Sequence, residues 1–283
     1  MSGYLAIPWY ITWPLVALCG YGALWFCANR SIYYPLKYPQ GLWQLQTQLR
    51  AEDTWIRTGD GVQIHGWWVR EEEARLVTLF LHGNAGNVTH RYARMREITA
   101  AGSSVLVLDY RGYGKSKGWP TEKGLYADAQ SSYQCLMEMG YRPEQIILHG
   151  ESIGCAVAIH VASRNPCGGL ILEAPFTSAA DVAQTVLPLL GPMLVRSFDS
   201  RNKISRVRSP VLFIHGDRDE VIPLRLGQKL FSAAPEPKAL WIVEGARHND
   251  ILEVAGRAYQ LRLRSFYDSL PALASGQARL DAR

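Results

Sequence analysis

The first 29 residues of this 283-residue chain contain no Asp, Glu, Lys, Arg or His. Charged residues make up only 19% of the chain, less than the roughly 25% of ordinary soluble domains. The five cysteines are few, odd in number and never in CxxC spacing, which argues against a disulfide framework and a zinc ribbon. No Lys/Arg run accompanies the net charge of +5, so we expect no nucleic-acid partner. The 48% of hydrophobic residues excludes a disordered chain.

The uncharged N-terminal stretch predicts a membrane anchor in residues 1–29. A helix of about 20 apolar residues crosses a hydrocarbon core, and the run from Tyr4 to Ala28 is longer than that. A cleaved signal peptide needs a basic start and a shorter apolar core, whereas a core helix of a soluble domain is the plainer alternative. Arg30, Lys37 and Arg50 follow the run. The positive-inside rule then places the remaining chain in the cytoplasm, beside membrane lipid.

The rest of the chain divides into a polar connector at 30–52, one domain at 53–272 and a C-terminal tail at 273–283. Two strand-like runs around a Gly-Asp-Gly turn predict a hairpin. Short runs rich in Val, Ile and Leu then alternate with helical segments, which is typical of an α/β fold with a mostly parallel sheet and helices on both faces. The predicted strands lie at 76–81, 104–110, 145–150, 169–175, 210–216 and 239–245, and the predicted helices near 88–101, 122–139, 153–163, 223–234 and 250–270. An insert at about 176–209 predicts a small cap, or alternatively a helix that packs into the core.

A candidate nucleophile follows the third of these strands. Gly150-Glu-Ser-Ile-Gly154 is a G-x-S-x-G motif between a predicted strand and a predicted helix. This context is typical of a sharp turn that exposes Ser152, with the helix N-terminus directed at a developing negative charge. A glycine-rich turn without chemistry is the alternative.

A serine nucleophile needs a base and an orienting carboxylate, which follow it in the order acid, then histidine. His248 stands after the last predicted strand, where a side chain can reach the carboxyl edge of the sheet. Asp217, Asp219 and Glu220 compete for the role of the acid. Asp217 comes directly at a strand end, where it can tie down the turn, so we select Asp219.

The oxyanion of an acyl-transfer reaction needs two hydrogen-bond donors. The backbone N–H of Ile153 follows the nucleophile, and Asn84 in the loop His82-Gly-Asn-Ala-Gly-Asn87 is the second candidate. A phosphate-binding loop is the rival interpretation, but the chain has neither a G-x-G-x-x-G motif nor a Walker lysine. No metal or organic cofactor is implied.

Six short runs stand in a characteristic order along residues 50–270: HGNAGN, LDYRGYGKSKG, GESIGC, EAPFTS, HGDRDEVIP and GARHND. With these runs the chain resembles the α/β-hydrolase superfamily, and more narrowly its BEM46-like group with the ABHD13- and ABHD17-type hydrolases. Cys155 departs from the second glycine that the family often has at this position. The resemblance implies the triad Ser152, Asp219 and His248, with the amides of Asn84 and Ile153 as the oxyanion hole.

The sequence therefore predicts a membrane-anchored serine hydrolase that cleaves esters or thioesters of acyl chains through an acyl-enzyme. A serine peptidase of the prolyl-oligopeptidase type shares this triad, but the chain lacks the N-terminal propeller of such enzymes. A catalytically idle scaffold that binds a partner at the membrane is the alternative from another class.

Overall fold

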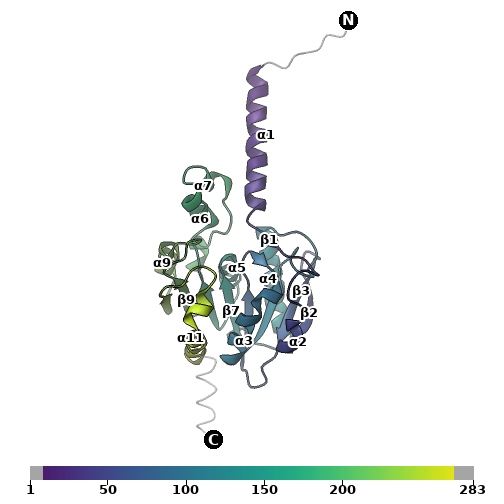
Figure 1. Cartoon of the computed structure of the whole chain (residues 1–283), viewed down its shortest axis with the longest axis vertical. Coiled ribbons are helices and arrows are strands. Elements are labelled where there is room, and N and C mark those ends of the chain that lie inside the picture. The colour runs from purple at the N-terminus through teal and green to yellow at the C-terminus, as the bar shows by residue number, and fades with distance from the viewer. Residues whose placement is uncertain (1–8, 271–283) are drawn as a thin grey trace.

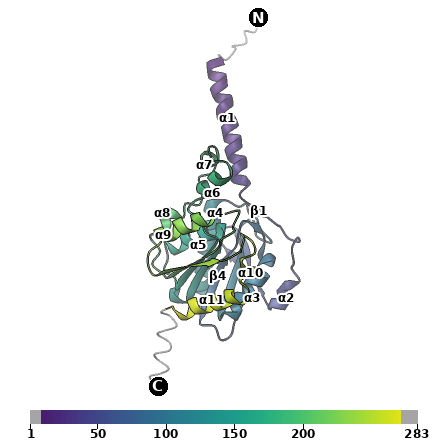
Figure 2. The same cartoon turned by 60° about the vertical axis from the view of Figure 1, so that its left-hand side comes forward.

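The computed structural model describes residues 9–270, with side chains from residue 13 onward. The beginning of the predicted anchor, residues 1–8, and the predicted tail at 273–283 lie outside the described residues. Between them, the chain forms one large sheet with helices packed on both faces, and a single long helix that stands away from it (Figures 1 and 2).

The sheet has eight strands in the order β10-β9-β8-β7-β4-β6-β3-β2. All neighbouring strands from β10 to β6 are parallel, whereas β3 is antiparallel to both β6 and β2. The predicted hairpin and the six predicted parallel strands are therefore all present. Their bounds are β2 (Glu52–Arg57), β3 (Gln63–Val69), β4 (Leu76–Leu81), β6 (Ser103–Asp109), β7 (Ile146–Glu151), β8 (Gly169–Glu173), β9 (Val211–Gly216) and β10 (Lys238–Val243).

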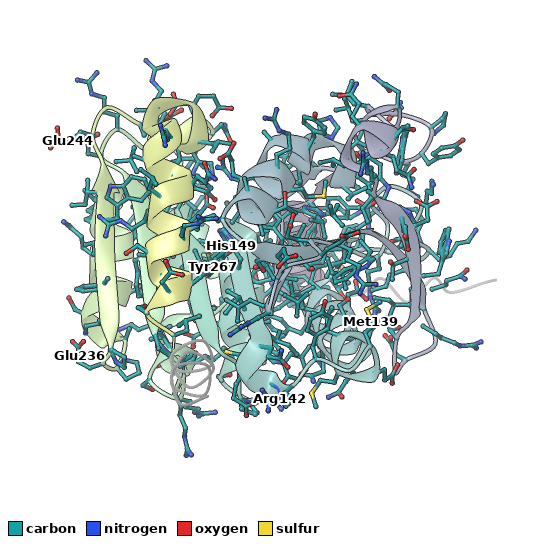
Figure 3. The ribbon with its side chains drawn as sticks, turned by 90° about the horizontal axis from the view of Figure 1, so that it is seen from below. Met139, Arg142, His149, Glu236, Glu244 and Tyr267 are labelled. Atoms are coloured by element: carbon teal, nitrogen blue, oxygen red, sulfur yellow. The ribbon has the colours of Figure 1, made fainter. Side chains whose placement is uncertain are left out.

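Helices α4, α5 and α9 cover one face of the sheet, and α3, α10 and α11 cover the other. Strands such as β4 and β6 are buried along their whole length, which is why they consist largely of apolar residues. Figure 3 shows α11, which carries Tyr267, lying over its face of the sheet near His149. Both of these side chains are buried. The bounds are η1 (Val88–Arg91), α3 (Tyr92–Ala100), α4 (Glu122–Glu138), η2 (Pro143–Gln145), α5 (Ile153–Ala162), α9 (Leu224–Ala233), α10 (Ile251–Ala255) and α11 (Arg257–Asp268).

The long N-terminal helix α1 (Trp9–Arg30) projects from the end of the molecule opposite α11 (Figures 1 and 2). Its large side chains are exposed, with Trp13 at 68% and Phe26 at 61% of their free surface. Within the described residues, no helix combines the length and the hydropathy that a membrane crossing requires. The predicted transmembrane helix is therefore not confirmed.

The segment 30–52, which we expected to be a plain connector, is folded against the domain. Strand β1 (Tyr34–Pro35) pairs in parallel with β5 (Ala85–Gly86), and α2 (Leu45–Leu49) follows. The Asn84 side chain donates to the carbonyl of Ile32 at 3.0 Å. Sequence composition did not indicate this docking because its partners lie about 50 residues further along the chain.

The insert between β8 and β9 contains α6 (Ala179–Val186), α7 (Gly191–Leu194) and α8 (Arg201–Ile204). Helix α6 has no buried residue, and Leu189 in the following turn is 85% exposed. The alternative of a core helix therefore does not describe α6. Two side chains of α1 hold α7: Tyr21 donates to the Met193 carbonyl and Asn29 to the Leu194 carbonyl, each at 2.8 Å.

Candidate active site

Ser152 occupies a sharp turn between β7 and α5. Its backbone has φ +55° and ψ −118°, a conformation that costs a non-glycine residue on the order of 1–3 kcal/mol. The two glycines of the motif make room for the turn: a Cβ at Gly150 would overlap the Gly154 backbone, and one at Gly154 would overlap the Leu81 carbonyl. The G-x-S-x-G pattern is thus a steric requirement of this turn.

A buried charge cluster lies directly below Ser152. The Ser152 N–H donates to the backbone carbonyl of Glu173 at 2.9 Å. The Glu173 carboxylate pairs with Arg94 at 3.0 Å and accepts hydrogen bonds from His149 and Tyr259. Burial alone would raise the pKa of Glu173, but the Arg94 charge and these hydrogen bonds lower it to about 2. Sequence reasoning missed this cluster because its four members are far apart in the chain.

The structure brings the three predicted triad side chains into one line. His248 Nε2 lies 3.1 Å from Ser152 Oγ, and His248 Nδ1 lies 2.8 Å from Asp219 Oδ2. An ionised carboxylate only accepts hydrogen bonds, so Nδ1 carries the proton and Nε2 is free to accept from the serine hydroxyl. This is the geometry of a serine nucleophile with a positioned general base.

Asp219 is held in its charged form. Burial would raise its pKa, but hydrogen bonds from His215 and His248, together with the backbone N–H of Ile222, keep the pKa well below its usual range. His215 Nε2 lies 3.4 Å from Asp219 and donates to the Ile222 carbonyl at 2.8 Å. His215 therefore braces the loop that carries the acid, a role that its position within a strand did not reveal.

Asp217 lies elsewhere on the same loop, as its place at the strand end suggested. Its carboxylate accepts the backbone N–H of Gly245 at 2.6 Å and contacts neither His248 nor Ser152. Asp217 thus links the loops that follow β9 and β10. The carboxylate that contacts the His248 imidazole is that of Asp219.

The loop after β4 lies against the nucleophile. A Cβ at Gly83 would lie 3.6 Å from the Ser152 side chain. The Asn84 side chain already donates a hydrogen bond to the Ile32 carbonyl. The backbone N–H of Asn84 is therefore the group that can serve as an oxyanion donor. Among residues 9–270, no backbone carbonyl of a turn, loop or helix cap accepts a hydrogen bond from the N–H of Asn84 or of Ile153. Both residues line the hollow at Ser152.

An apolar hollow of about 560 Å³ opens at the triad. Its volume falls in the range of ordinary small-molecule sites. Its walls come from the base of α1, the loop after β4, and the cap helices α6 and α7. Besides Ser152, His248, Asn84, Ile153 and Asn249, the lining consists of Ala28, Ser31, Ile32, Ala85, Phe176, Ala179, Val182, Ala183, Val186, Leu187, Gly191, Leu194, Val195, Phe198, Val221 and Ile222.

A second hollow beside the nucleophile is smaller and more polar than the first. It shares Asn84, Ser152 and His248 with the apolar hollow and adds Arg91 and Glu151, which lie 3.6 Å apart. The reacting bond would therefore sit between an apolar and a polar compartment.

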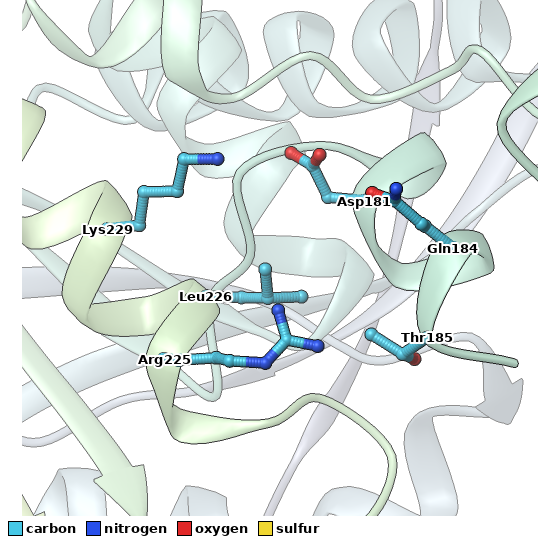
Figure 4. A pocket seen from close by; sticks show the side chains of 6 residues that line it. All are labelled: Asp181, Gln184, Thr185, Arg225, Leu226 and Lys229. Atoms are coloured by element: carbon cyan, nitrogen blue, oxygen red, sulfur yellow. The ribbon is translucent and has the colours of Figure 1, made fainter. Parts of the chain in front are cut away.

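A third hollow lies between α6 and α9 (Figure 4). That hollow contains no triad residue and lies on the outer face of α6. It is lined by Asp181, Gln184, Thr185, Arg225, Leu226 and Lys229.

Two further observations bear on the chemistry. Burial raises the pKa of the Cys155 thiol well above its usual range, so the cysteine beside Ser152 is a neutral core side chain. No group of His, Cys, Asp and Glu side chains in the described part of the chain is gathered as a metal ion would need.

The fold and this arrangement define the class as an α/β-hydrolase. Residues 72–203 match the family described as "Serine aminopeptidase, S33". The chain is 35% identical to protein bem46 of Schizosaccharomyces pombe, over 69% of this chain and 71% of that protein. It is 38% identical to the α/β-hydrolase domain-containing protein 17B of Homo sapiens, over 74% of this chain and 73% of that protein. An esterase of Pyrococcus furiosus superposes with a TM-score of 0.70 at 20% identity, covering 84% of this chain and 98% of its own. The chain belongs to the BEM46-like group of α/β-hydrolases.

The distinction between the two aspartates can be tested directly. Asp219→Asn should keep the fold and reduce kcat on a soluble ester by about 10³- to 10⁴-fold, because the imidazole loses its orienting charge. Asp217→Asn should keep most of the activity and lower the melting temperature, because the Gly245 contact weakens. Ester hydrolysis and thermal melts of both variants provide the measurement, and a reversal of the two effects would assign the acid to Asp217.

Proposed function

We propose that this protein is a serine hydrolase that cleaves carboxylic esters or thioesters of acyl chains. The supporting observation is the line of hydrogen bonds from Ser152 through His248 to Asp219 at the edge of an apolar hollow. An acyl chain in this hollow would present its carbonyl to Ser152 and direct its leaving group toward the polar hollow.

The reaction would proceed in two stages. His248 Nε2 takes the Ser152 proton as Oγ attacks the carbonyl carbon, and the N–H groups of Asn84 and Ile153 stabilise the oxyanion. The protonated imidazole then gives its proton to the departing alcohol or thiol, leaving an acyl-enzyme. Water, deprotonated by His248, attacks the acyl carbonyl and releases the carboxylic acid together with the free serine.

The lining of the hollow favours acyl esters over aminopeptidase substrates. A free α-ammonium group needs a carboxylate, and the apolar hollow has no Asp or Glu among its described lining residues. Glu151 lines the polar hollow, but the charge of Arg91 offsets it. A peptidase of the prolyl-oligopeptidase type and a non-catalytic scaffold are the competing functions that the first experiment below separates.

The nucleophile can be identified by covalent labelling. A fluorophosphonate probe should modify Ser152 of the purified full-length protein, since the hydroxyl is paired with a base. Ser152→Ala should stay folded, lose the label and hydrolyse esters at least ~10³-fold more slowly, because only binding and the oxyanion hole remain. Mass spectrometry and assays with acyl esters, acyl thioesters and aminoacyl amides give the result. Unlabelled Ser152 would favour the scaffold, and a preference for the amides would favour a peptidase.

The acyl hollow can be tested with two variants of α6. Ala183 lines the apolar hollow, whereas its neighbour Gln184 lines the hollow on the outer face of the helix. Ala183→Trp should reduce kcat/KM for long-chain esters by roughly 10- to 100-fold, because each displaced methylene loses about 0.8 kcal/mol of burial. Short esters should be cleaved at nearly the original rate.

Gln184→Trp is the matched control and should leave the chain-length profile unchanged. Equal losses on short and long esters in Ala183→Trp, or the same shift in both variants, would contradict an acyl site in this hollow.

We further propose that the N-terminal segment anchors the protein in a membrane, with the catalytic domain on the cytoplasmic side. Support comes from the absence of charged residues in 1–29 and the basic residues Arg30, Lys37 and Arg50 that follow. The exposed apolar side chains of α1 agree with this proposal, because such a surface needs an apolar partner.

The anchor is tested by fractionation. The full-length protein should remain in the membrane pellet after a carbonate wash, whereas a variant lacking residues 1–29 should move to the supernatant and still react with the fluorophosphonate probe. Extraction of the full-length protein by carbonate would contradict the anchor. A truncated variant that stays in the pellet would place membrane attachment elsewhere in the chain.

A further inference from the structure

Two positively charged side chains lie over one exposed indole ring at the base of α1. Trp119, on the loop between β6 and α4, is 62% exposed. The Arg30 guanidinium carbon lies 4.9 Å from its ring centre, and the Lys37 ammonium lies 4.6 Å from it. Arg30 is the last residue of α1 and Lys37 follows β1, so three separate segments converge here. We call these three residues the Trp119 collar.

The collar carries charge that the described part of the chain does not neutralise. Neither Arg30 nor Lys37 forms a salt bridge with any residue in 9–270. An aromatic ring attracts a cation but has no net charge to cancel it. Two like charges at one ring repel each other, so an anion near both would stabilise the arrangement.

The collar lies where polar and apolar surfaces meet. Above it, α1 exposes large apolar side chains, including Trp25 at 46% and Phe26 at 61%. Beside it, Tyr34 and Tyr38 are each more than half exposed. Aromatic residues with Arg or Lys at the end of an apolar segment are typical of the headgroup zone of a bilayer.

The collar also stands next to the entrance of the acyl hollow. Ala28, Ser31 and Ile32, which flank Arg30 in the chain, line that hollow. Val186 of the cap also lines the hollow and is 80% exposed, and Leu189 in the turn that follows is 85% exposed. The cap and α1 lie at the same end of the molecule (Figures 1 and 2), and both expose large apolar residues.

We propose that the Trp119 collar binds anionic lipid headgroups, with a lipid phosphate beside Arg30 and Lys37. This contact fixes how deeply the domain sits in the membrane surface. At that depth the cap turn with Leu189 enters the bilayer, and the apolar hollow at Ser152 opens toward the acyl chains of the lipids. The headgroup contact rests on the collar and on the membrane anchor proposed above, whereas the delivery of acyl chains rests on the proposed hydrolase activity.

The test uses the full-length protein reconstituted in phosphatidylcholine vesicles with and without phosphatidylglycerol. A vesicle-embedded long-chain ester should be cleaved about 5- to 30-fold faster when phosphatidylglycerol is present, since each basic residue near an anionic surface contributes about 1 kcal/mol. In Arg30→Gln/Lys37→Gln this ratio should fall to near one. High salt should reduce the wild-type ratio, because it screens the charges.

The control removes an equal charge from the far end of the molecule. Arg262 also lies over an indole, that of Trp241 at 5.3 Å, but it belongs to α11, opposite α1 (Figures 1 and 2). Arg257→Gln/Arg262→Gln should keep the wild-type ratio. Fluorophosphonate labelling and melting temperatures check that both double variants are folded. An unchanged ratio in Arg30→Gln/Lys37→Gln, or an equal loss in the control, would overturn the proposal.

A second readout is independent of catalysis. The fluorescence difference between the Ser152→Ala protein and the same protein with Trp119→Phe isolates the emission of Trp119. A quencher attached to the lipid headgroup should reduce this emission in phosphatidylglycerol vesicles. An unquenched Trp119 would overturn the collar as a lipid site and leave an acidic protein partner as the better explanation. Quenching of Trp119, together with no ester hydrolysis by the wild-type protein, would disprove the proposed function and leave the headgroup contact standing.

Discussion

The backbone turn at Ser152 is the constraint on which the rest of the site depends. Its positive φ is unfavourable for a serine, and the surrounding core holds it in place. The Ser152 N–H is bonded to the Glu173 carbonyl, and the Glu173 side chain is locked by Arg94, His149 and Tyr259. Removing one partner of such a pair leaves a buried charge uncompensated, which typically costs about 3–5 kcal/mol, so these partners fix the Glu173 side chain next to the turn.

The direction of the nucleophile follows from this turn. Parallel strands bring their carboxyl ends to one edge of the sheet, and the loops after β4, β7, β9 and β10 all meet there. These loops supply Asn84, Ser152, Asp219 and His248 respectively. The cap and the base of α1 then close one side of the edge with apolar residues, and Arg91 with Glu151 leaves the other side polar. This asymmetry supports the proposal of an acyl substrate with a polar leaving group.

Helix α1 also contributes to the site, because it lines the apolar hollow and contacts the cap. Its last turn forms part of the wall of the hollow, and Tyr21 and Asn29 hold α7. The position of the cap over the triad therefore depends on a helix that is remote from the triad in sequence. Arg30 at the end of this helix is also part of the Trp119 collar, so the wall of the hollow and the collar share one helix.

Local sequence determined much of this protein. The six parallel strands could be predicted because five of them are buried along nearly their whole length and are therefore largely apolar. The turn at Ser152 could be predicted because only glycines leave room for it. Asp219 and His248 could be selected because they follow Ser152 in the order known for α/β-hydrolases, and because the loop that carries His248 can reach the carboxyl edge of the sheet. The tertiary structure alone decided the contacts between distant segments: Glu173 with Arg94, His215 beside Asp219, the docking of residues 30–52 on the Asn84 loop, and Arg30 and Lys37 over Trp119. Residue patterns report the periodicity of a single segment, whereas these contacts depend on how segments pack together, and packing brings together residues that no local pattern connects.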